Sequence, residues 1–323
     1  MCRRATCAKT VVDDVDQTVR AESLAGIWFA GYPCGALFVR RVREDGRQMS
    51  EHGGVATFAP RRPVRVLVLA HGFPWADGSQ SDCFLAEYAR AAVERWTAFA
   101  ELHHSIIIAP AFGGSDFGGY RALFGRKIDA DEFVNSVVDQ VAREHIPSYS
   151  GRFSLHGHSA GAQFAARYLV THPQRLEEVV LSAPSAYAFP DPALPWPDGM
   201  AAVVRDQLSG SRADGKAPEQ AAGAIFVPRP TGWLAAASEV SVSVLVGSRD
   251  TEPRPPEPGQ QGTTRIERAT AWVDSMHRHA EASDRAPTIR LVQADGLDHD
   301  EAAMAIPAQL ILAQKWTDNS CRF

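Results

Sequence analysis

The sequence has 323 residues, of which 45% are apolar and 22% charged, so it can bury a sizeable core and is neither disordered nor fibrous. The net charge is -5, with 33 basic and 38 acidic residues spread along the chain, which leaves no basic surface for a phosphate backbone. We therefore expect no nucleic-acid partner and one large α/β domain over residues 21–323 that carries an insertion.

The first 20 residues, Met1 to Arg20, form a polar N-terminal tail without the apolar segment of a signal peptide. No apolar run approaches the length of a membrane span, so the sequence as given predicts a cytoplasmic protein. The 5 cysteines are scattered without metal-ligand spacing, and we expect reduced thiols. A disulfide between Cys2 and Cys7 stays open if a leader was removed.

The predicted elements begin with three short strands, Gly26–Tyr32, Ala36–Val42 and Val55–Ala59, which are typical of an antiparallel sheet edge. The next strand, Val64–Ala70, is almost entirely apolar and is predicted to be covered on both faces. A helix is predicted over Asp82–His103. Its inward side chains recur at three- and four-residue steps: Leu85, Tyr88, Ala92, Trp96, Phe99 and Leu102.

Strands and helices then alternate, which predicts a mostly parallel sheet flanked by helices, with right-handed crossovers. The further strands expected are Ser105–Ala109 (stopped by Pro110), Phe153–His156, Val179–Ala183, Val240–Val246 and Thr288–Val292. The further helices expected are one capped by Asp129 or Asp131 with Phe133, Val137, Val138 and Val141 inward, then Ala160–Thr171, Arg265–Ala282 and Glu301–Trp316.

Two proline-rich stretches interrupt this alternation. Prolines recur between Pro184 and Ser238, and this part of the chain is predicted to form an insertion or cap, residues 184–238. The second stretch, Glu252–Gly262, is rich in Pro, Gly and Gln and is predicted to be a mobile loop.

The strongest local motif is Gly157-His158-Ser159-Ala160-Gly161, which lies between a predicted strand and a predicted helix. A serine on such a sharp turn projects its hydroxyl from the carboxyl end of the sheet, and the glycines let the turn close. The motif therefore predicts that Ser159 is a catalytic nucleophile. The alternative is a turn whose serine only caps the helix.

A serine hydroxyl needs a base, and the base needs an orienting acid; in this architecture the chain order is Ser, acid, His. Asp250 follows the strand Val240–Val246, and His299 follows the last strand. We predict that these two residues are the acid and the base. Asp295 and Asp298 are alternative acids, whereas Asp300 and Glu301 are expected to favour the N-terminus of the last helix.

An acyl-transfer site must also bind the oxyanion that develops on the carbonyl. Two backbone amides are expected to donate: that of Ala160, directly after the nucleophile, and that of Phe73, directly after His71-Gly72. The alternative for this second stretch is a tight turn with a buried aromatic residue.

These motifs resemble those of the α/β-hydrolase family over roughly Val64 to Trp316. The elbow around Ser159 together with His71-Gly72 is most similar to serine esterases and polyester-depolymerase-like hydrolases. The His-Gly-Gly-Gly motif of the hormone-sensitive-lipase branch is absent, and a serine at the elbow differs from the Asp of haloalkane dehalogenases. The resemblance implies an α/β-hydrolase fold, and the predicted serine mechanism needs no cofactor.

The insertion is expected to set the substrate. Aromatic residues that could line an apolar acyl or aryl pocket are Trp75, Phe189, Trp196 and Trp233. The alternative is that those of the insertion pack it onto the main domain. The acids and histidines lack metal-ligand spacing, so no metal is expected. The Gly-rich stretch Gly113–Gly119 lacks the Gly-Lys-Ser/Thr end of a phosphate loop.

The sequence thus predicts a serine carboxylic-ester hydrolase that acts on a small or oligomeric ester. The same residues would also suit an amidase, a peptidase or an acyltransferase. A binding protein that kept the fold without the chemistry is the alternative outside the enzymes.

Overall fold

A computed structural model describes residues 27–32, 35–40, 64–73, 82–112, 117, 119–124, 128–146, 149–204, 225–226, 239–257, 259–282 and 288–320. The described strands of the main sheet are β1 (Ile27–Tyr32), β2 (Gly35–Arg40), β3 (Arg65–Ala70), β4 (Ser105–Pro110), β5 (Phe153–His158), β6 (Leu176–Ser182), β9 (Ser241–Gly247) and β10 (Ile289–Ala294). Two short strands, β7 (Val203–Val204) and β8 (Ile225–Phe226), pair separately.

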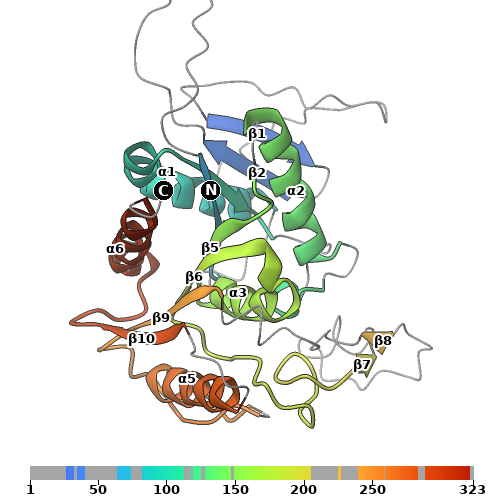
Figure 1. Ribbon diagram of the computed structural model, residues 1–323, viewed down its shortest axis with the longest axis vertical. Coiled ribbons are helices and arrows are strands. Elements are labelled where there is room, and N and C mark those ends of the chain that lie inside the picture. The colour runs from blue at the N-terminus through green and yellow to red at the C-terminus, as the bar shows by residue number, and fades with distance from the viewer. Residues whose placement is uncertain are drawn as a thin grey trace, which may run out of the picture.

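The described helices are α1 (Asp82–His103), α2 (Ala130–His145), α3 (Ala160–Thr171), α5 (Arg265–Glu281) and α6 (Glu301–Ser320), with short 3-10 turns η1 (Tyr120–Ala122) and η2 (Pro173–Arg175). The main sheet has the order β1-β2-β4-β3-β5-β6-β9-β10 and carries helices on both faces (Figure 1). β1 and β2 are antiparallel at one edge, and the strands from β4 to β10 run parallel. The predicted α/β class and the antiparallel edge are confirmed.

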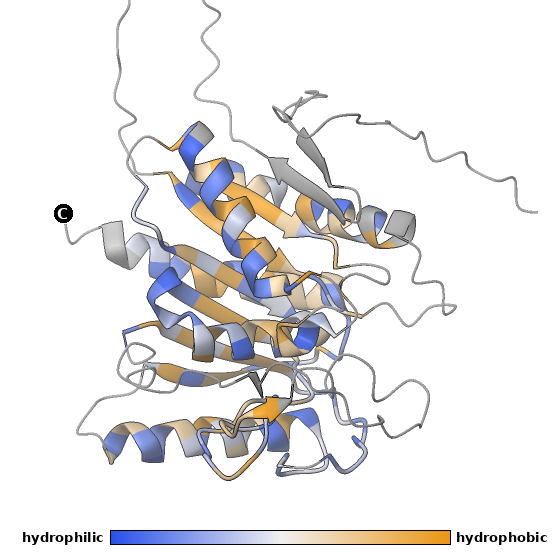
Figure 2. Cartoon of the chain, turned by 90° about the vertical axis from the view of Figure 1, so that its right-hand side faces the viewer, coloured by the Kyte–Doolittle hydropathy of each residue, from blue (hydrophilic) through white to orange (hydrophobic). Residues whose placement is uncertain are grey.

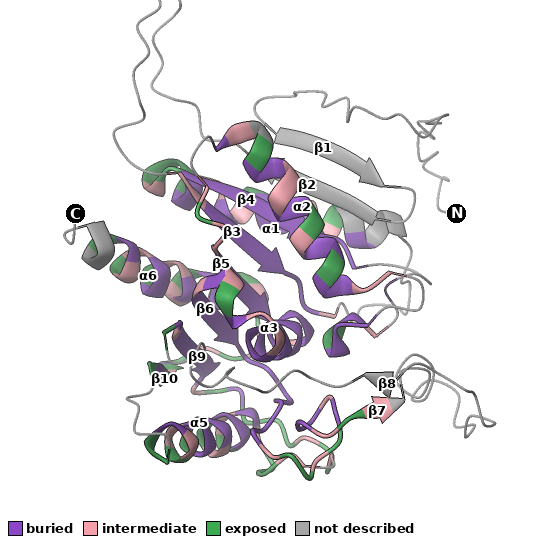
Figure 3. Cartoon of the chain, turned by 45° about the vertical axis from the view of Figure 1, so that its right-hand side comes forward, coloured by how far each residue is buried: buried purple, intermediate pink, exposed green. Residues whose placement is uncertain are grey.

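The sheet is apolar on both faces because successive side chains of a strand point to opposite sides. In β3, Val66 and Val68 belong to the core cluster that also holds residues of α2, α3 and α5, whereas Leu67 and Leu69 belong to the cluster that holds residues of α1 and α6. The central strands are buried in Figure 3 and mostly hydrophobic in Figure 2. A strand that is covered on both faces needs a continuous apolar run, which is the pattern seen in the sequence.

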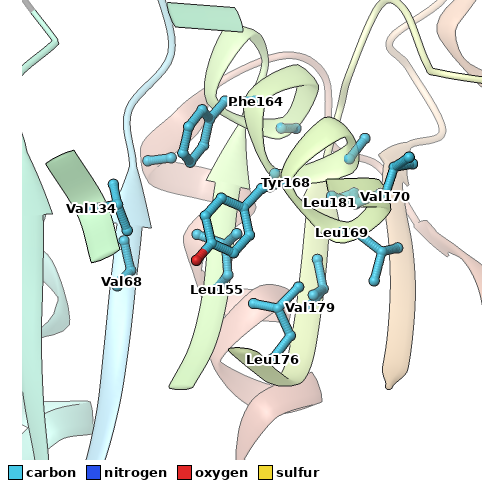
Figure 4. Packing of buried hydrophobic residues seen from close by; sticks show 14 of the residues in the cluster. Val68, Val134, Leu155, Phe164, Tyr168, Leu169, Val170, Leu176, Val179 and Leu181 are labelled. Atoms are coloured by element: carbon cyan, nitrogen blue, oxygen red, sulfur yellow. The ribbon is translucent and has the colours of Figure 1, made fainter. Parts of the chain in front are cut away.

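Helix α3 is buried along its length, from Ala160 to Val170. Phe164 and Tyr168 project from it into the core that also holds Leu155 of β5 (Figure 4). On another side of the helix, Arg167 donates to the carbonyl of Pro197 at 2.9 Å. The helix behind the predicted nucleophile is therefore fixed on several sides.

The parallel register brings the loops that follow β3, β5, β9 and β10 to one edge of the sheet. Ala70, the last residue of β3, pairs with Gly157 of β5, and Gly247 of β9 pairs with Ala294 of β10. The residues that follow these strands in the sequence are therefore neighbours in space.

Several bounds agree with the sequence prediction, and α1 and α3 agree at both ends. The expectation that Leu102 faces inward is wrong, because this side chain is 72% exposed. The inward place in the last turn of α1 is taken by His103, whose ring lies 4.5 Å from that of Phe99 and 5.6 Å from that of Trp316. Strand β4 includes Pro110, and α6 continues past Trp316 to Ser320.

The predicted strand Val55–Ala59 and the tail of residues 1–20 lie outside the described residues. Of the predicted insertion, residues 184–204 and 225–226 are described, so its extent as a cap stays a prediction. Among the helices that the structure describes, none has both the length and the apolar character that a membrane span requires.

The described start of the insertion, residues 184–201, is called the β6 segment here. Its aromatic side chains are buried: Tyr187 is 0% exposed, Phe189 3% and Trp196 1%. The indole of Trp196 donates to the carbonyl of Ala122 at 3.0 Å. The ring of Tyr187 stacks on Trp272 of α5 at 4.9 Å between centroids. The segment is therefore packed into the body of the molecule.

The stretch between Asp250 and α5, residues 251–264, is called the β9 loop. Its Gln260 side chain accepts from the amide of Tyr187 at 2.9 Å and donates to the carbonyl of the same residue at 2.8 Å. Arg268 of α5 donates to the carbonyls of Pro255 and Ser185, each at 2.6 Å. Side chains thus tie the predicted mobile loop over Glu252–Gly262 to the β6 segment, and its mobility stays a prediction.

Candidate active site

The turn between β5 and α3 carries Ser159 in a strained backbone conformation, with φ 51° and ψ -111°. The neighbouring glycines make the turn possible. A Cβ at Gly157 would lie 2.2 Å from the carbonyl oxygen of Gly161, and a Cβ at Gly161 would lie 2.0 Å from that of Ala70. The amide of Ser159 donates to the carbonyl of Ser182 in β6 at 2.8 Å. Strain of this kind persists only where the surroundings hold it.

The structure brings Ser159, His299 and Asp250 into one hydrogen-bonded series. Nε2 of His299 lies 3.0 Å from Oγ of Ser159, and Nδ1 of His299 lies 2.9 Å from Oδ2 of Asp250. Ser159 comes from the β5–α3 turn, Asp250 from the loop after β9 and His299 from the loop after β10. The last two loops are joined by the amide of Arg249, which donates to the carbonyl of Leu297 at 2.8 Å.

Asp250 is almost fully buried, at 4% exposed. Burial alone would raise the pKa of this carboxyl, but the hydrogen bond with His299 and the charge of Arg265 outweigh it and hold the pKa below its usual value. An ionised carboxylate can only accept, so Nδ1 of His299 carries the hydrogen and Nε2 is the acceptor for the serine hydroxyl. This is the tautomer that a general base requires.

The alternative acids lie elsewhere. The exposed carboxylate of Asp298 accepts from the amide of Asp300 at 3.0 Å, and that of Asp295 accepts from the hydroxyl of Ser248 at 3.3 Å. Among the three candidate carboxylates, Asp250 is the one that pairs with His299 in the described structure.

Asp300 and Glu301 divide between two roles. The Asp300 carboxylate accepts from the amide three residues on at 2.7 Å and so caps α6, as expected. Glu301 turns inward instead, where the Tyr88 hydroxyl and the Gly72 amide donate to it and Arg95 lies 3.7 Å away. Burial raises the pKa of Glu301, and these three partners only partly offset that effect. The carboxylate thus joins α1 and α6 to the loop after β3.

The loop after β3 is held by His71. Its Nε2 accepts from the amide of Phe112 at 3.0 Å, so Nδ1 carries the hydrogen and donates to the carbonyl of Gly72 at 2.7 Å. Burial lowers the pKa of His71 to about 4, so the ring is neutral. In a planar trans peptide the carbonyl and the next amide point in opposite directions, and the bond to Gly72 therefore orients the Phe73 amide.

The two expected oxyanion donors belong to well-fixed backbone. Ala160 is the first residue of α3, and the first amides of a helix have no acceptor within it. Phe73 is half-buried at the end of the loop that His71 holds. The role of both amides stays a prediction.

His158, inside the elbow motif, is a neighbour of the base that the sequence did not single out. Its ring lies 5.0 Å from that of His299, its Nδ1 is 3.4 Å from the Ser182 hydroxyl, and it hydrogen-bonds to the main chain of His299. Burial, followed by the charges of the nearby histidines, lowers its pKa well below the usual value. His158 therefore stays neutral beside His299.

The residues predicted to line a substrate pocket are distributed differently. Phe189 and Trp196 are buried in the core, in keeping with the alternative that they pack the insertion onto the main domain. Trp75 and Trp233 lie outside the described residues. In the described part of the chain, no three His, Cys, Asp or Glu side chains are grouped so that they could hold a metal ion.

Sequence reasoning also missed Arg265, which pairs with Asp250 at 2.5 Å. An arginine at the start of a helix is indistinguishable in sequence from an exposed one, so no local signal pointed to it. For His158, the available signal was its position directly before Ser159 in the Gly157–Gly161 motif.

Comparisons with known proteins bear on the fold. No protein-family model matches the sequence, and curated protein sequences give no match either. Among solved structures, poly(aspartic acid) hydrolase-1 from Sphingomonas sp. KT-1 has a TM-score of 0.61 at 20% identity, over 88% of this chain and 96% of that one. A poly(3-hydroxybutyrate) depolymerase from Bordetella parapertussis has a TM-score of 0.57 at 21% identity, over 91% and 85%.

A fluorophosphonate-binding serine hydrolase from Staphylococcus aureus is also similar, with a TM-score of 0.51 at 15% identity, over 89% of this chain and 96% of that one. The mostly parallel sheet is flanked by helices, and these solved structures match the chain over most of its length. The chain therefore has the α/β-hydrolase fold that the sequence motifs implied.

Proposed function

We propose that this protein is a serine hydrolase that cleaves carboxylic esters through an acyl-enzyme. Ser159 is the nucleophile, His299 the general base and Asp250 the acid that orients it. The amides of Phe73 and Ala160 stabilise the oxyanion.

In the first half of the reaction, Oγ of Ser159 bonds to the ester carbonyl carbon while its proton passes to Nε2 of His299. The carbonyl electron pair moves to the oxygen, which the two amides bind. The bond to the alcohol then breaks, and the imidazolium returns its proton to the leaving oxygen. In the second half, water repeats the attack and releases the acid, which restores Ser159. No cofactor takes part.

The observation that carries this proposal is the hydrogen-bonded series from Ser159 through His299 to Asp250, with distances of 3.0 Å and 2.9 Å. Three separate loops contribute to it. A strained serine, an imidazole in the correct tautomer and a buried ionised carboxylate are what nucleophilic catalysis by serine needs.

Labelling with a fluorophosphonate, followed by peptide mapping, tests the nucleophile. The label is expected on Ser159 of the wild type and absent from Ser159→Ala. A matched control is Ser182→Ala, since this hydroxyl lies near His158 without contacting His299 in the described structure. Label on another residue, or turnover that survives in a folded Ser159→Ala protein, would refute the mechanism.

The same residues would serve an amidase, a peptidase or an acyltransferase, so the substrate class needs its own measurement. A panel of p-nitrophenyl esters, peptide anilides, poly(3-hydroxybutyrate) and poly(aspartic acid) separates these activities. We expect turnover of the esters to exceed that of the anilides. Labelling without turnover of any panel member would leave the nucleophile supported and the ester specificity refuted.

A further inference from the structure

The carboxylate of Asp250 has a second oxygen, and a buried arginine holds it. Oδ2 faces His299, whereas Oδ1 accepts from a guanidinium nitrogen of Arg265 at 2.5 Å. The side chains of Arg265 and Asp250 are 4% and 2% exposed, so this ion pair is shielded from solvent. The hydrogen-bonded series therefore has four members, and Arg265 is the one farthest from Ser159.

Arg265 occupies an unfavourable place for a cation. It is the first residue of α5, where the helix dipole repels positive charge, and burial removes its hydration. The capping box formed by Thr264 and Glu267 already satisfies the helix start without it. Within the described residues, Nε of Arg265 has no hydrogen-bond partner. Asp250 is thus the contact that accounts for an arginine at this position.

We propose that Arg265 is a positioning residue of the reaction: it fixes the carboxylate plane of Asp250 and offsets part of its charge, so that the base works at a lower pH. This inference rests on the proposed function. A carboxylate held at both oxygens cannot rotate away from His299, and a half-neutralised carboxylate stabilises the imidazolium less than a free one.

Among the charged groups around Asp250 and His299, Arg265 has the main influence on the Asp250 carboxylate. His158 packs against His299 but stays neutral. Glu252 lies 4.0 Å from Arg265 and is 73% exposed, and it also pairs with Arg254 at 3.5 Å. Solvent screens such exposed charges.

Asp298 and Asp300 flank His299 in sequence and are exposed, so solvent screens their carboxylates as well. Arg265 is therefore the buried full charge whose removal should be visible in a pH profile.

The test measures kcat/KM as a function of pH and compares the acidic limb of the profile in four proteins: the wild type, Arg265→Gln, Arg265→Lys and Arg268→Gln. Arg268 is the matched control, a buried arginine one turn further along α5 that binds the carbonyls of Ser185 and Pro255. In Arg265→Gln we expect the limb to move up by about half to one pH unit and kcat to fall about tenfold. Arg265→Lys should return the limb towards its wild-type place, and Arg268→Gln should leave it unmoved.

A double-mutant cycle with Asp250→Asn shows whether Arg265 acts through Asp250. Asp250→Asn/Arg265→Gln removes both buried charges, so it remains informative if Arg265→Gln alone does not fold. We expect Arg265→Gln to leave kcat/KM unchanged once Asp250 is replaced. A further tenfold loss in the double variant, or an unmoved limb in folded Arg265→Gln, would overturn the inference.

These results are separable from those that bear on the proposed function. If fluorophosphonate does not label Ser159 of the wild type, the proposed function fails. If the label is found and the wild type turns over esters while Arg265→Gln behaves as Arg268→Gln does, only the role of Arg265 fails.

Discussion

Two regions at the carboxyl edge of the sheet are built in opposite ways. The first holds Ser159, which is half-buried and strained, and His299, whose side chain is 30% exposed. The second is the contact between the β6 segment and the β9 loop, where Tyr187 and Arg268 are both 0% exposed. Residues of the first region should matter for chemistry more than for stability, and residues of the second for stability more than for chemistry.

The second region shows how irregular backbone is buried in this fold. Loop carbonyls and amides need partners when water is excluded, and here Arg268 and Gln260 supply them. The proline-rich β6 segment therefore becomes part of the core without a helix or strand of its own.

The largest expected effect is on activity, in the first region. Ser159→Ala should lower kcat by a factor on the order of 10⁶, because the nucleophile is lost, while thermal unfolding changes little. Steady-state kinetics and a melting curve on the same sample test this. A large drop in Tm would show that the comparison between the regions is wrong at this residue.

Asp250→Asn should lower kcat by about 10⁴, because an amide in place of the carboxylate favours the wrong tautomer of His299. Asp298→Asn is the matched control and should stay near wild type, since its carboxylate accepts from the Asp300 amide. If Asp298→Asn were the crippling change, Asp250 would not be the acid.

In the second region, Trp196→Ala should lower the free energy of unfolding by about 3–5 kcal/mol, because it empties a fully buried site. Denaturant unfolding followed by circular dichroism measures the change. Leu102→Ala, at a position that is 72% exposed, should change it by less than about 0.5 kcal/mol. Equal effects of the two substitutions would contradict the buried place of Trp196.

A smaller loss is expected from Gln260→Ala, which leaves the amide and the carbonyl of Tyr187 without these partners. We expect a decrease of about 1–3 kcal/mol in the free energy of unfolding. The neighbouring exposed residue provides the control, and Gln261→Ala should be close to neutral. Faster proteolysis within the β9 loop of Gln260→Ala would support the same contact.

A pH-dependent effect on stability concerns Glu178, near the amino end of β6. Burial raises the pKa of Glu178 from 4.5 to about 8. Between these values the unfolded chain releases a proton that the folded chain keeps, so the contribution of Glu178 to stability falls as pH rises from about 4.5 to 8. Glu178→Gln should gain stability relative to wild type over that window, and exposed Glu281→Gln should not. Unfolding curves at pH 5 and pH 8 decide this.

The sequence predicted the elements whose packing depends on one periodic pattern. The strand at Val64–Ala70 and the helix at Ala160–Thr171 are examples, because an apolar run or stripe identifies a buried element locally. It also predicted that Ser159, Asp250 and His299 follow strands whose ends meet, and the structure brings them together.

What the sequence could not predict depends on contacts between distant residues. Nothing near Arg265 distinguishes it from a surface arginine, and its place follows from Asp250, 15 residues earlier in the chain. The main chain of the β6 segment is likewise bonded at Tyr187 to Gln260, 73 residues away. Leu102 was misplaced because the next inward residue after Phe99 can lie three or four residues further on. In the structure it is His103, four residues after Phe99.

The close approach at Gly161 has a consequence for how this protein can change over evolution. The start of α3 rests on the main chain of β3 at Ala70, with no side chain between them. The spacing between the serine turn and the loop after β3 is therefore set by atoms that every amino acid shares. Other positions can drift far in sequence while that spacing persists, as long as the glycine itself is kept. Solved structures with 20% and 21% identity to this chain still superpose on most of it.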